Sequence, residues 1–267
     1  SPHNLPGQVI GIAIGSKGAV VFSKKWRLHA RRFDLDGEYQ MSLLMPPANL
    51  PDEKLAGMGY VEYEPGKKAV HAANAYQTVA DRGRLYWGIP GDTIADVQPA
   101  LYDDRVYFLG FNGYQGENPP SPLYWLKLDG STEYKGIHGA GFAFSTQRYP
   151  RMVSSPDGTW LYAVGIDPFP HAVMRRSRTG DEPGEPFLGN IRKSGKGKVS
   201  VAMGSDEGSF NKATGIDCDA KGRIYVCDGM NNRIQIFSPE GKHLKTIKID
   251  RPSLVRVHRK TGAMYVL

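Results

Sequence analysis

Residues 213–249 read ATGIDCDAKGRIYVCDGMNNRIQIFSPEGKHLKTIKI, and this stretch decides the fold. Short alternating apolar runs are separated here by turns that contain Gly, Asp or Asn, which predicts strands rather than helices. The predicted strands cover 215–219, 223–227, 233–237 and 242–248, with a loop at 228–232 between the second and the third. The stretch therefore predicts a sheet of four consecutive antiparallel strands.

The same pattern of short strands and turns occurs in five more places along the chain. These places are residues 8–46, 58–90, 97–137, 149–189 and 252–267. The predicted first strands begin at a mean spacing of about 49 residues, close to the roughly 40–50 residues of one β-propeller blade. We therefore predict an all-β fold, a six-bladed β-propeller forming a single domain over 1–267, rather than a β-sandwich. The last repeat stops after two strands at Leu267, so we expect an incomplete sixth blade and a fragment of a longer protein.

Composition agrees with this prediction and excludes some classes of protein. The 267 residues include 32 Gly and 19 Pro, which suits many turns, and 40% hydrophobic residues, which suffices for a core. No run of 18 apolar residues is present, which excludes a membrane-spanning helix. The formal charge of +7 permits nucleic acid or acidic glycan partners without requiring them. Two cysteines are too few for a disulfide scaffold.

The start of the chain, SPHNLPGQ, has neither an initiator Met nor the basic and apolar regions of a signal peptide. We expect a processed chain or one cut from a longer protein. A secreted or periplasmic location is favoured over a cytoplasmic one.

Residues 215–244 resemble the NHL repeat, whose pattern combines a Gly-apolar-x-x-Asp strand with an Asn-x-Arg-Ile-x-x-Phe segment. The matching residues are Gly215, Asp219, Gly222, Tyr225, Val226, Asp228, Asn231, Arg233, Ile234, Phe237 and Gly241. The resemblance implies a six-bladed NHL-type propeller, a fold often found as a module of a larger protein. The other repeats keep only the pattern of hairpins.

We expect the motif residues to stabilise the fold rather than to bind a ligand. Asp228 and Arg233 flank the 228–232 loop and are placed to pair across it. Pairing through the turn at 220–222 sets Cys218 opposite Ile224 and not opposite Cys227. We therefore predict two buried free thiols rather than a disulfide or a metal pair.

A ligand site is expected where the loops after the second strands meet the linkers between blades, because loops on a rigid scaffold carry function. The candidate ligand-binding residues in these segments are Trp26, Asn74, Tyr76, Asn112, Tyr114, Glu117, His138, Arg148, Asp167 and His171. Aromatic rings mixed with amide, acidic and imidazole groups suit a hydroxyl-rich ligand such as a sugar. Ordinary solvated loops contain the same residue types.

A metal enzyme is the more specific alternative, because some NHL-type propellers are lyases that hold a metal with histidines from separate blades. Here His71, either His138 or His171, and His258 come from different blades, and three histidines can bind zinc. His258, however, lies beside the turn at 259–262, at the wrong end of its strand. A lactonase-type hydrolase would need calcium ligands such as Glu117, Asn74 and Asp167, but no family motif is matched.

Three basic clusters, SKKWRLHARR (23–32), MRRSR (174–178) and IRKSGKGK (191–198), raise the possibility of RNA binding, which some NHL propellers show. The last cluster is Gly-spaced and is predicted to be a mobile loop. The favoured function is a binding module, without a cofactor, that recognises a small ligand, a glycan or a protein. A metal-dependent lyase or hydrolase is the alternative, with calcium or zinc in the channel, and RNA binding ranks third.

Overall fold

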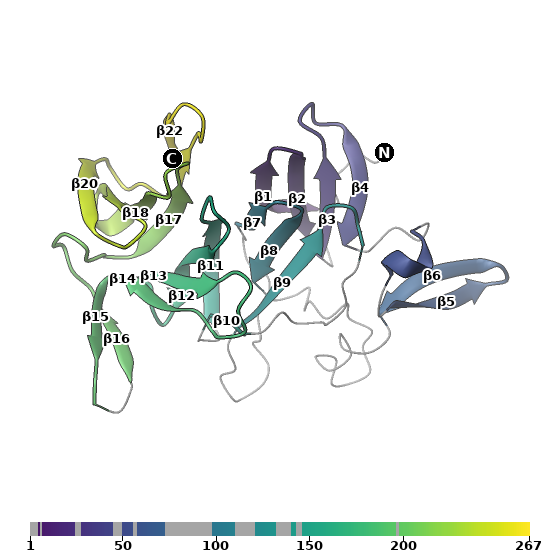
Figure 1. Cartoon of the computed structure of the whole chain (residues 1–267), viewed down its shortest axis with the longest axis horizontal. Coiled ribbons are helices and arrows are strands. Elements are labelled where there is room, and N and C mark those ends of the chain that lie inside the picture. Colours follow the sequence, from purple (N-terminus) through teal and green to yellow (C-terminus); the bar gives the residue numbers. More distant parts are fainter. Residues whose placement is uncertain are drawn as a thin grey trace. The chain divides into compact units, whose positions relative to one another are not determined.

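The computed structural model describes residues 5, 7–24, 28–44, 50–55, 58–72, 98–109, 121–131, 140–142, 146–195 and 198–267. The chain divides into two compact units (Figure 1). The first contains residues 1–114 and 122–138, and the second contains residues 115–121 and 139–267. Whether the two units form the predicted single domain stays a prediction.

The first unit contains one complete four-stranded sheet, one hairpin and a further set of three strands. The sheet consists of β1 (Gln8–Gly15), β2 (Gly18–Lys24), β3 (Leu28–Phe33) and β4 (Tyr39–Leu44), each antiparallel to the next. A 3-10 turn, η1 (Asp52–Lys54), precedes the hairpin β5 (Met58–Glu64) and β6 (Lys67–Ala72). The remaining strands, again paired in chain order, are β7 (Ala100–Tyr102), β8 (Arg105–Leu109) and β9 (Ser121–Lys127).

The second unit contains two complete four-stranded sheets. A short strand, β10 (Ala140–Phe142), precedes the sheet of β11 (Thr146–Ser154), β12 (Trp160–Asp167), β13 (Val173–Ser177) and β14 (Glu185–Leu188). The sheet at the motif, called the NHL sheet below, consists of β17 (Ala213–Cys218), β18 (Ile224–Asp228), β19 (Arg233–Phe237) and β20 (His243–Lys248). A 3-10 turn, η2 (Gly229–Asn231), joins β18 to β19.

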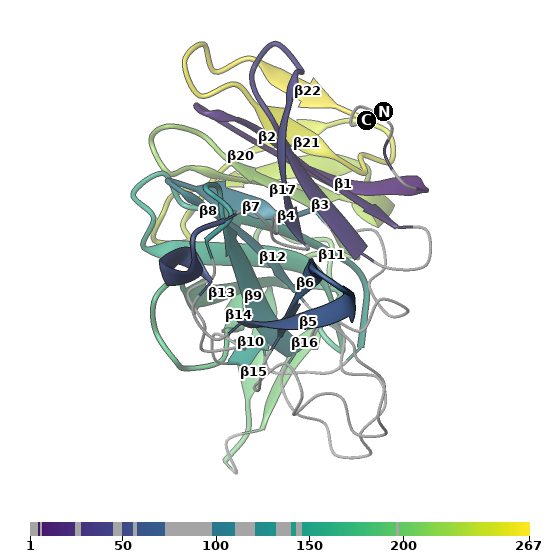
Figure 2. The same cartoon turned by 90° about the vertical axis from the view of Figure 1, so that its right-hand side faces the viewer.

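Two hairpins complete the second unit. The hairpin β15 (Asn190–Lys193) and β16 (Val199–Ala202) links the two sheets along the chain. The last hairpin, β21 (Val255–Val257) and β22 (Met264–Val266), lies beside β17 (Figures 1 and 2). The two strands of this last repeat are those that the sequence predicts.

The fold is therefore all-β, and its repeated sheets of four consecutive antiparallel strands are those of a β-propeller. The predicted strand 233–237 coincides with β19, and the other predicted strands of the NHL sheet differ from the observed ones by one or two residues at their ends. Cys218 pairs with Ile224, and both cysteines are free and buried. Both predictions about the thiols are confirmed.

Acidic side chains close the turns between the first and second strands. In the NHL sheet, Asp219 Oδ1 accepts the backbone N–H groups of Lys221 and Arg223 at 3.0 and 2.9 Å. Gly222 supplies the left-handed backbone that this turn needs, with φ = +77°. In the β11–β12 turn, Asp157 Oδ1 accepts the N–H of Thr159 at 3.0 Å. Because each of these turns is closed by side chains close to it in the sequence, the hairpins can be predicted from the sequence.

The core of each unit lies between its sheets. In the first unit the rings of Phe22 and Phe108 lie 5.1 Å apart and both are fully buried. In the second unit Phe210 and Phe237 lie 5.8 Å apart, and both are buried. Full burial of such a ring contributes about 1.5–3 kcal/mol to folding, so these aromatic pairs are major contributors to each core.

The prediction of a mobile loop at 191–198 is wrong for part of that segment. Residues 190–193 form β15, in which Ile191 pairs with Val201 of β16. The β-branched residues Ile191, Val199 and Val201 favour extended backbone, which explains why the flanking residues form strands. The hairpin projects from the sheets of the second unit in both views (Figures 1 and 2).

Candidate ligand-binding site

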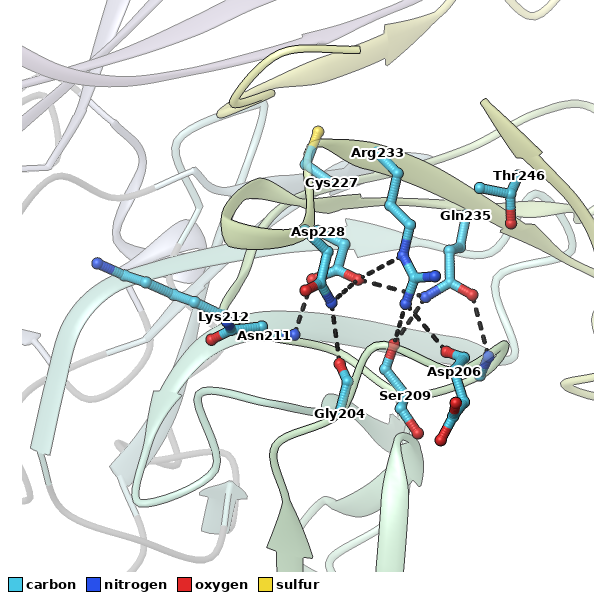
Figure 3. Close-up of polar contacts among 12 residues, drawn as sticks. Gly204, Asp206, Ser209, Asn211, Lys212, Cys227, Asp228, Arg233, Gln235 and Thr246 are labelled. Carbon is cyan, nitrogen blue, oxygen red and sulfur yellow. Dashed lines mark hydrogen bonds and ion pairs between the residues drawn. The ribbon is translucent and has the colours of Figure 1, made fainter. Parts of the chain in front are cut away.

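A buried carboxylate organises the end of the NHL sheet at which β18 leads into the loop 229–232, called the loop end below (Figure 3). Asp228 ends β18 and is 0% exposed. Its Oδ2 accepts hydrogen bonds from Arg233 Nε and Asn231 Nδ2, both at 2.8 Å. Its Oδ1 accepts the backbone N–H of Asn211 at 2.8 Å. The predicted pairing of Asp228 with Arg233 is confirmed, and a buried charge with this many partners is well compensated.

The same network reaches the segment 203–212, which precedes the NHL sheet. Arg233 Nη2 donates to the carbonyl oxygens of Asp206 and Ser209 at 2.9 and 3.0 Å. Gln235 is fully buried; its Nε2 donates to Ser209 O at 2.8 Å, and its Oε1 accepts the N–H of Gly208 at 3.0 Å. The motif side chains therefore fix a segment that contains no strand of the NHL sheet.

Backbone hydrogen bonds join the loops at this end of the second unit to one another. Ala213 N donates to Pro170 O at 2.8 Å, which connects the start of β17 to the β12–β13 loop. Met230 N donates to Asn211 O at 3.3 Å, and Ile249 N donates to Asn232 O at 3.0 Å. We call the resulting surface, made of residues 168–172, 203–212, 229–232 and 249–254, the loop face. It combines the loops after the second strands with the linkers before the first strands, as the sequence predicts for a site.

Three residues of the loop face have left-handed backbone without being glycine. They are Lys212 (φ = +68°), Asn232 (φ = +52°) and Arg251 (φ = +38°). Asn tolerates this region, but Lys and Arg adopt it at a cost of about 1–2 kcal/mol each. Such strain concentrates at functional sites, which makes Lys212 and Arg251 candidates for contact with a ligand.

Polar groups also lie buried along β17 and β21, where the NHL sheet meets the last hairpin. The Asp217 carboxylate accepts the N–H groups of Val257 and Cys218 at 2.8 and 2.9 Å, and burial raises its pKa. Burial likewise lowers the pKa of the Arg256 guanidinium. Burial raises the pKa of the Cys227 thiol to about 12, so this thiol is not a nucleophile at neutral pH. These groups attach the last hairpin to the NHL sheet.

The structure describes the side chain of one of the ten predicted site residues. His171 lies on the loop face, and its Nδ1 accepts the backbone N–H of Lys212 at 3.1 Å. Arg148 lies in β11 and Asp167 ends β12, but only their backbones are described. The residues Trp26, Asn74, Tyr76, Asn112, Tyr114, Glu117 and His138 lie outside the described residues.

Sequence reasoning missed Lys212 and Arg251. Lys212 directly precedes the stretch 213–249 and Arg251 directly precedes the repeat 252–267, and counting positions within the repeat is the signal that could have found them. Asn232 lies in the predicted loop 228–232, and its Oδ1 accepts the N–H of Arg251 at 3.1 Å, a contact between residues 19 positions apart that spacing does not predict.

The histidines proposed as zinc ligands are only partly described. His258 Nδ1 is 2.8 Å from the Thr261 hydroxyl in the turn after β21, which confirms its predicted place beside that turn. For His71 the backbone alone is described, within β6. Within the described ranges, no three side chains of His, Cys, Asp or Glu come together as metal ligands.

The basic cluster at 174–178 is built into the sheet instead of forming a charged patch. The Arg175 guanidinium lies 4.3 Å from the Trp160 ring centroid and 3.9 Å from that of Phe187. Arg176 is 2% exposed and donates to the carbonyl oxygens of Ser177 and Gly180, both at 2.7 Å. The Arg175 guanidinium therefore packs on aromatic rings, and the Arg176 guanidinium donates hydrogen bonds to backbone carbonyl groups.

Comparison with known proteins identifies the motif. Residues 210–237 match the family model of the NHL repeat, which confirms that the chain contains one. A comparison with curated proteins found no match. None of the helices among the described residues is long and apolar enough to cross a membrane.

Several solved propeller enzymes and binding proteins are similar in structure at a low level. A gluconolactonase from Xanthomonas campestris is 12% identical with a TM-score of 0.47, covering 100% of this chain and 85% of that one. A luciferin-regenerating enzyme is 12% identical with a TM-score of 0.47, covering 98% and 71%. Regucalcin, a calcium-binding protein from Agrobacterium tumefaciens, is 16% identical with a TM-score of 0.40, covering 95% and 79%. At these TM-scores the likenesses carry no argument about the function of this chain.

Proposed function

We propose that this chain is a binding module that recognises its ligand on the loop face of the second unit. The observation that supports this most directly is the network around Asp228, which holds segment 203–212 against the loop 229–232. A loop surface fixed by buried charges loses little conformational freedom when a ligand binds, and this preserves affinity. His171 and Asn232 then stand on a surface that is already formed.

We also propose that the sheets belong to a six-bladed propeller. This rests on the six predicted repeats, each of which contains at least one observed antiparallel hairpin. An experimental structure of the protein, with its blades counted, tests this part separately from the binding function.

Screening of the purified chain against neutral glycans, acidic glycans, peptides and oligonucleotides tests the binding function. We expect one class to bind, and expect His171→Ala to weaken that binding while Lys221→Gln leaves it unchanged. Lys221 lies in the turn at the opposite end of β17 and β18. A stoichiometric metal ion whose removal abolishes turnover of a lactone or another substrate would instead establish the enzymatic alternative.

A further inference from the structure

The β15–β16 hairpin, which projects from the sheets of the second unit (Figures 1 and 2), is strongly basic. Residues 186–205 include four Lys or Arg residues and no Asp or Glu. The side chains of Arg192, Lys193 and Lys198, called the hairpin cations below, are exposed. None of the three forms a side-chain hydrogen bond or an ion pair within the described part of the chain. Their charges are therefore available to a partner.

The register of the hairpin brings the hairpin cations close together. Lys193 pairs with Val199, and Ser194 N donates to Lys198 O at 3.0 Å. Paired strands lie about 5 Å apart and each residue adds about 3.3 Å along a strand, so the three Cα atoms lie within about 9 Å of one another. The turn end of the hairpin therefore concentrates positive charge.

The nearest acidic residues along the chain, Glu185 and Asp206, lie outside the hairpin. The carbonyl oxygen of Asp206 accepts a hydrogen bond from Arg233 Nη2, which holds this residue beside the NHL sheet. At the base of the hairpin, Ala202 lies four residues after Lys198, about 13 Å along an extended strand. The screening length at physiological ionic strength is about 8 Å. The acidic groups beyond the base therefore compensate the charge at the turn end only weakly.

The hairpin is also amphipathic. Ile191 pairs with Val201, and Lys193 pairs with Val199. Paired residues, and residues two positions apart on one strand, point to the same face, so the three aliphatic side chains share a face. All three are partly exposed, and Met203, which follows β16, is 61% exposed. The hairpin thus combines an apolar face with cations at its turn end.

This combination suits the interface of an anionic membrane, where Lys and Arg attract lipid headgroups and apolar side chains enter the outer acyl region. Nucleic acid would pair its phosphates with the cations but would leave the apolar face unused, and residues 190–203 contain no aromatic ring for base stacking. Protein interfaces favour aromatic residues and contain little Lys, whereas three of the four cations in 186–205 are Lys. These features favour a lipid surface.

We propose that the β15–β16 hairpin attaches the protein to anionic membrane surfaces. The hairpin lies along the interface with Ile191, Val199 and Val201 toward the acyl chains. The hairpin cations contact the phosphate groups of the lipids. This attachment goes beyond the binding function of the loop face and does not depend on it.

Co-sedimentation of the purified chain with vesicles tests the proposal. We expect binding to vesicles of equal parts phosphatidylglycerol and phosphatidylcholine, and far weaker binding to phosphatidylcholine alone. Lys193→Gln/Lys198→Gln should lower the partition coefficient about 25-fold, because each cation near an anionic membrane contributes about fivefold. The matched control Lys221→Gln/Lys242→Gln removes the same charge from turns of the NHL sheet and should bind as the wild type does.

A second variant tests the apolar face. Val199→Thr/Val201→Thr preserves the β-branched shape that favours strands and the net charge, but it makes the face more polar. The partition coefficient should fall about fivefold, because part of the transfer free energy of two Val side chains is lost. Circular dichroism of the variant should match that of the wild type.

The outcomes separate the proposal from its alternatives. Equal loss in the two lysine double variants would indicate unspecific attraction and overturn the hairpin site. Unchanged binding of the threonine variant would overturn the contact of the apolar face with lipid. Binding of a double-stranded oligonucleotide without binding of vesicles would replace the membrane by nucleic acid.

The loop face provides the last control. His171→Ala should leave vesicle binding unchanged, because His171 lies on the loop face and outside the hairpin. Absence of vesicle binding would overturn the membrane attachment alone, whereas an effect of His171→Ala equal to that of Lys193→Gln/Lys198→Gln would overturn the assignment to the hairpin.

Discussion

The sheet β1–β4 and the NHL sheet share an architecture but differ at their loop ends. Each has four consecutive antiparallel strands and a fully buried phenylalanine on its second or third strand, Phe22 or Phe237. At the loop end of β18, Asp228 is the acceptor of a hydrogen-bond network. Near the corresponding end of β2, Ser23 is also 0% exposed, but its hydroxyl has no hydrogen-bond partner in the described part of the chain.

This difference shows what the NHL motif specifies. A four-stranded sheet forms without the motif, because alternating apolar residues and turn-forming residues are sufficient. The motif adds a buried ion pair and amide groups that fix the neighbouring loop. It therefore encodes an ordered loop end, and the predictions below separate that contribution from the stability of the sheet itself.

The largest expected effect is that of Asp228→Ala. Removal of the carboxylate leaves the largely buried Arg233 guanidinium, whose side chain is 12% exposed, without its partner, so the free energy of unfolding should fall by about 3–5 kcal/mol. Urea denaturation followed by fluorescence measures this loss. Ser23→Ala is the matched change in the first unit and should alter stability by less than about 1 kcal/mol, because it removes a hydroxyl that has no partner. Equal losses in the two variants would contradict the distinction between the sheets.

Glycine-to-alanine substitutions in the first strands should give a smaller contrast. A Cβ at Gly215 would lie 2.9 Å from Ser253 O and 3.0 Å from Leu254 Cα, and this backbone cannot easily move. A Cβ at Gly15 would instead meet the end of the flexible Leu101 side chain. Gly215→Ala should therefore cost about 1–3 kcal/mol and Gly15→Ala less. Thermal denaturation of both variants measures the difference, and a larger loss for Gly15→Ala would refute this account.

Two acidic residues should give the NHL sheet a pH dependence that β1, which has no titratable side chain, cannot show. Burial raises the pKa of Asp217 above its ordinary 3.8, so stability should fall as pH rises from 3.8 through the raised pKa. For Asp219, burial acts to raise the pKa, but the hydrogen bonds and charge of Arg223 outweigh it and lower the pKa. Its stabilisation should be lost as pH falls below 3.8 through the lowered pKa.

Unfolding curves between pH 2 and pH 7 test these two signs. Asp217→Asn should remove the loss of stability with rising pH, and Asp219→Asn should remove the loss with falling pH. The account of Asp217 fails if its variant keeps the pH slope of the wild type.

The smallest effect should be seen in thiol reactivity, which reports on the second unit alone. The two cysteines of the chain lie in β17 and β18, where both are buried and burial raises both pKa values. An aromatic disulfide reagent at pH 8 should react slowly with the folded protein. Asp228→Ala should accelerate labelling and Ser23→Ala should not. Rapid labelling of the wild type would show that the NHL sheet opens readily.

Local interactions account for the part of the fold that could be predicted from the sequence. Cys218 opposite Ile224 follows from a turn of a few residues, and the pairing of Asp228 with Arg233 spans five positions. The contacts of Arg233 with Asp206 and Ser209 span 27 and 24 positions, and no spacing rule predicts them. The β15–β16 hairpin was not predicted, because the glycines and lysines of residues 191–198 indicate a mobile loop.

The sequence predicts where the candidate site lies, among the loops after the second strands and the linkers between blades, but it predicts few of the residues that form it. His171 was found because it follows a second strand. Lys212 and Arg251 were missed because their relevance depends on left-handed backbone and on acceptors from a preceding sheet. Residue type alone does not reveal either property.

The attachment of the last hairpin to the NHL sheet has a consequence for how such chains can be built and altered. Thr214 Oγ1 donates to Pro252 O at 2.9 Å, and Val257 N donates to Asp217 Oδ2 at 2.8 Å. Neighbouring repeats are thus fastened by side chains, without a strand shared between their sheets. A repeat that ends at Asp250 is therefore a natural unit for duplication or exchange. Gene duplication could lengthen such a chain, and a designer could graft a different loop end, while the rest of each sheet stayed the same.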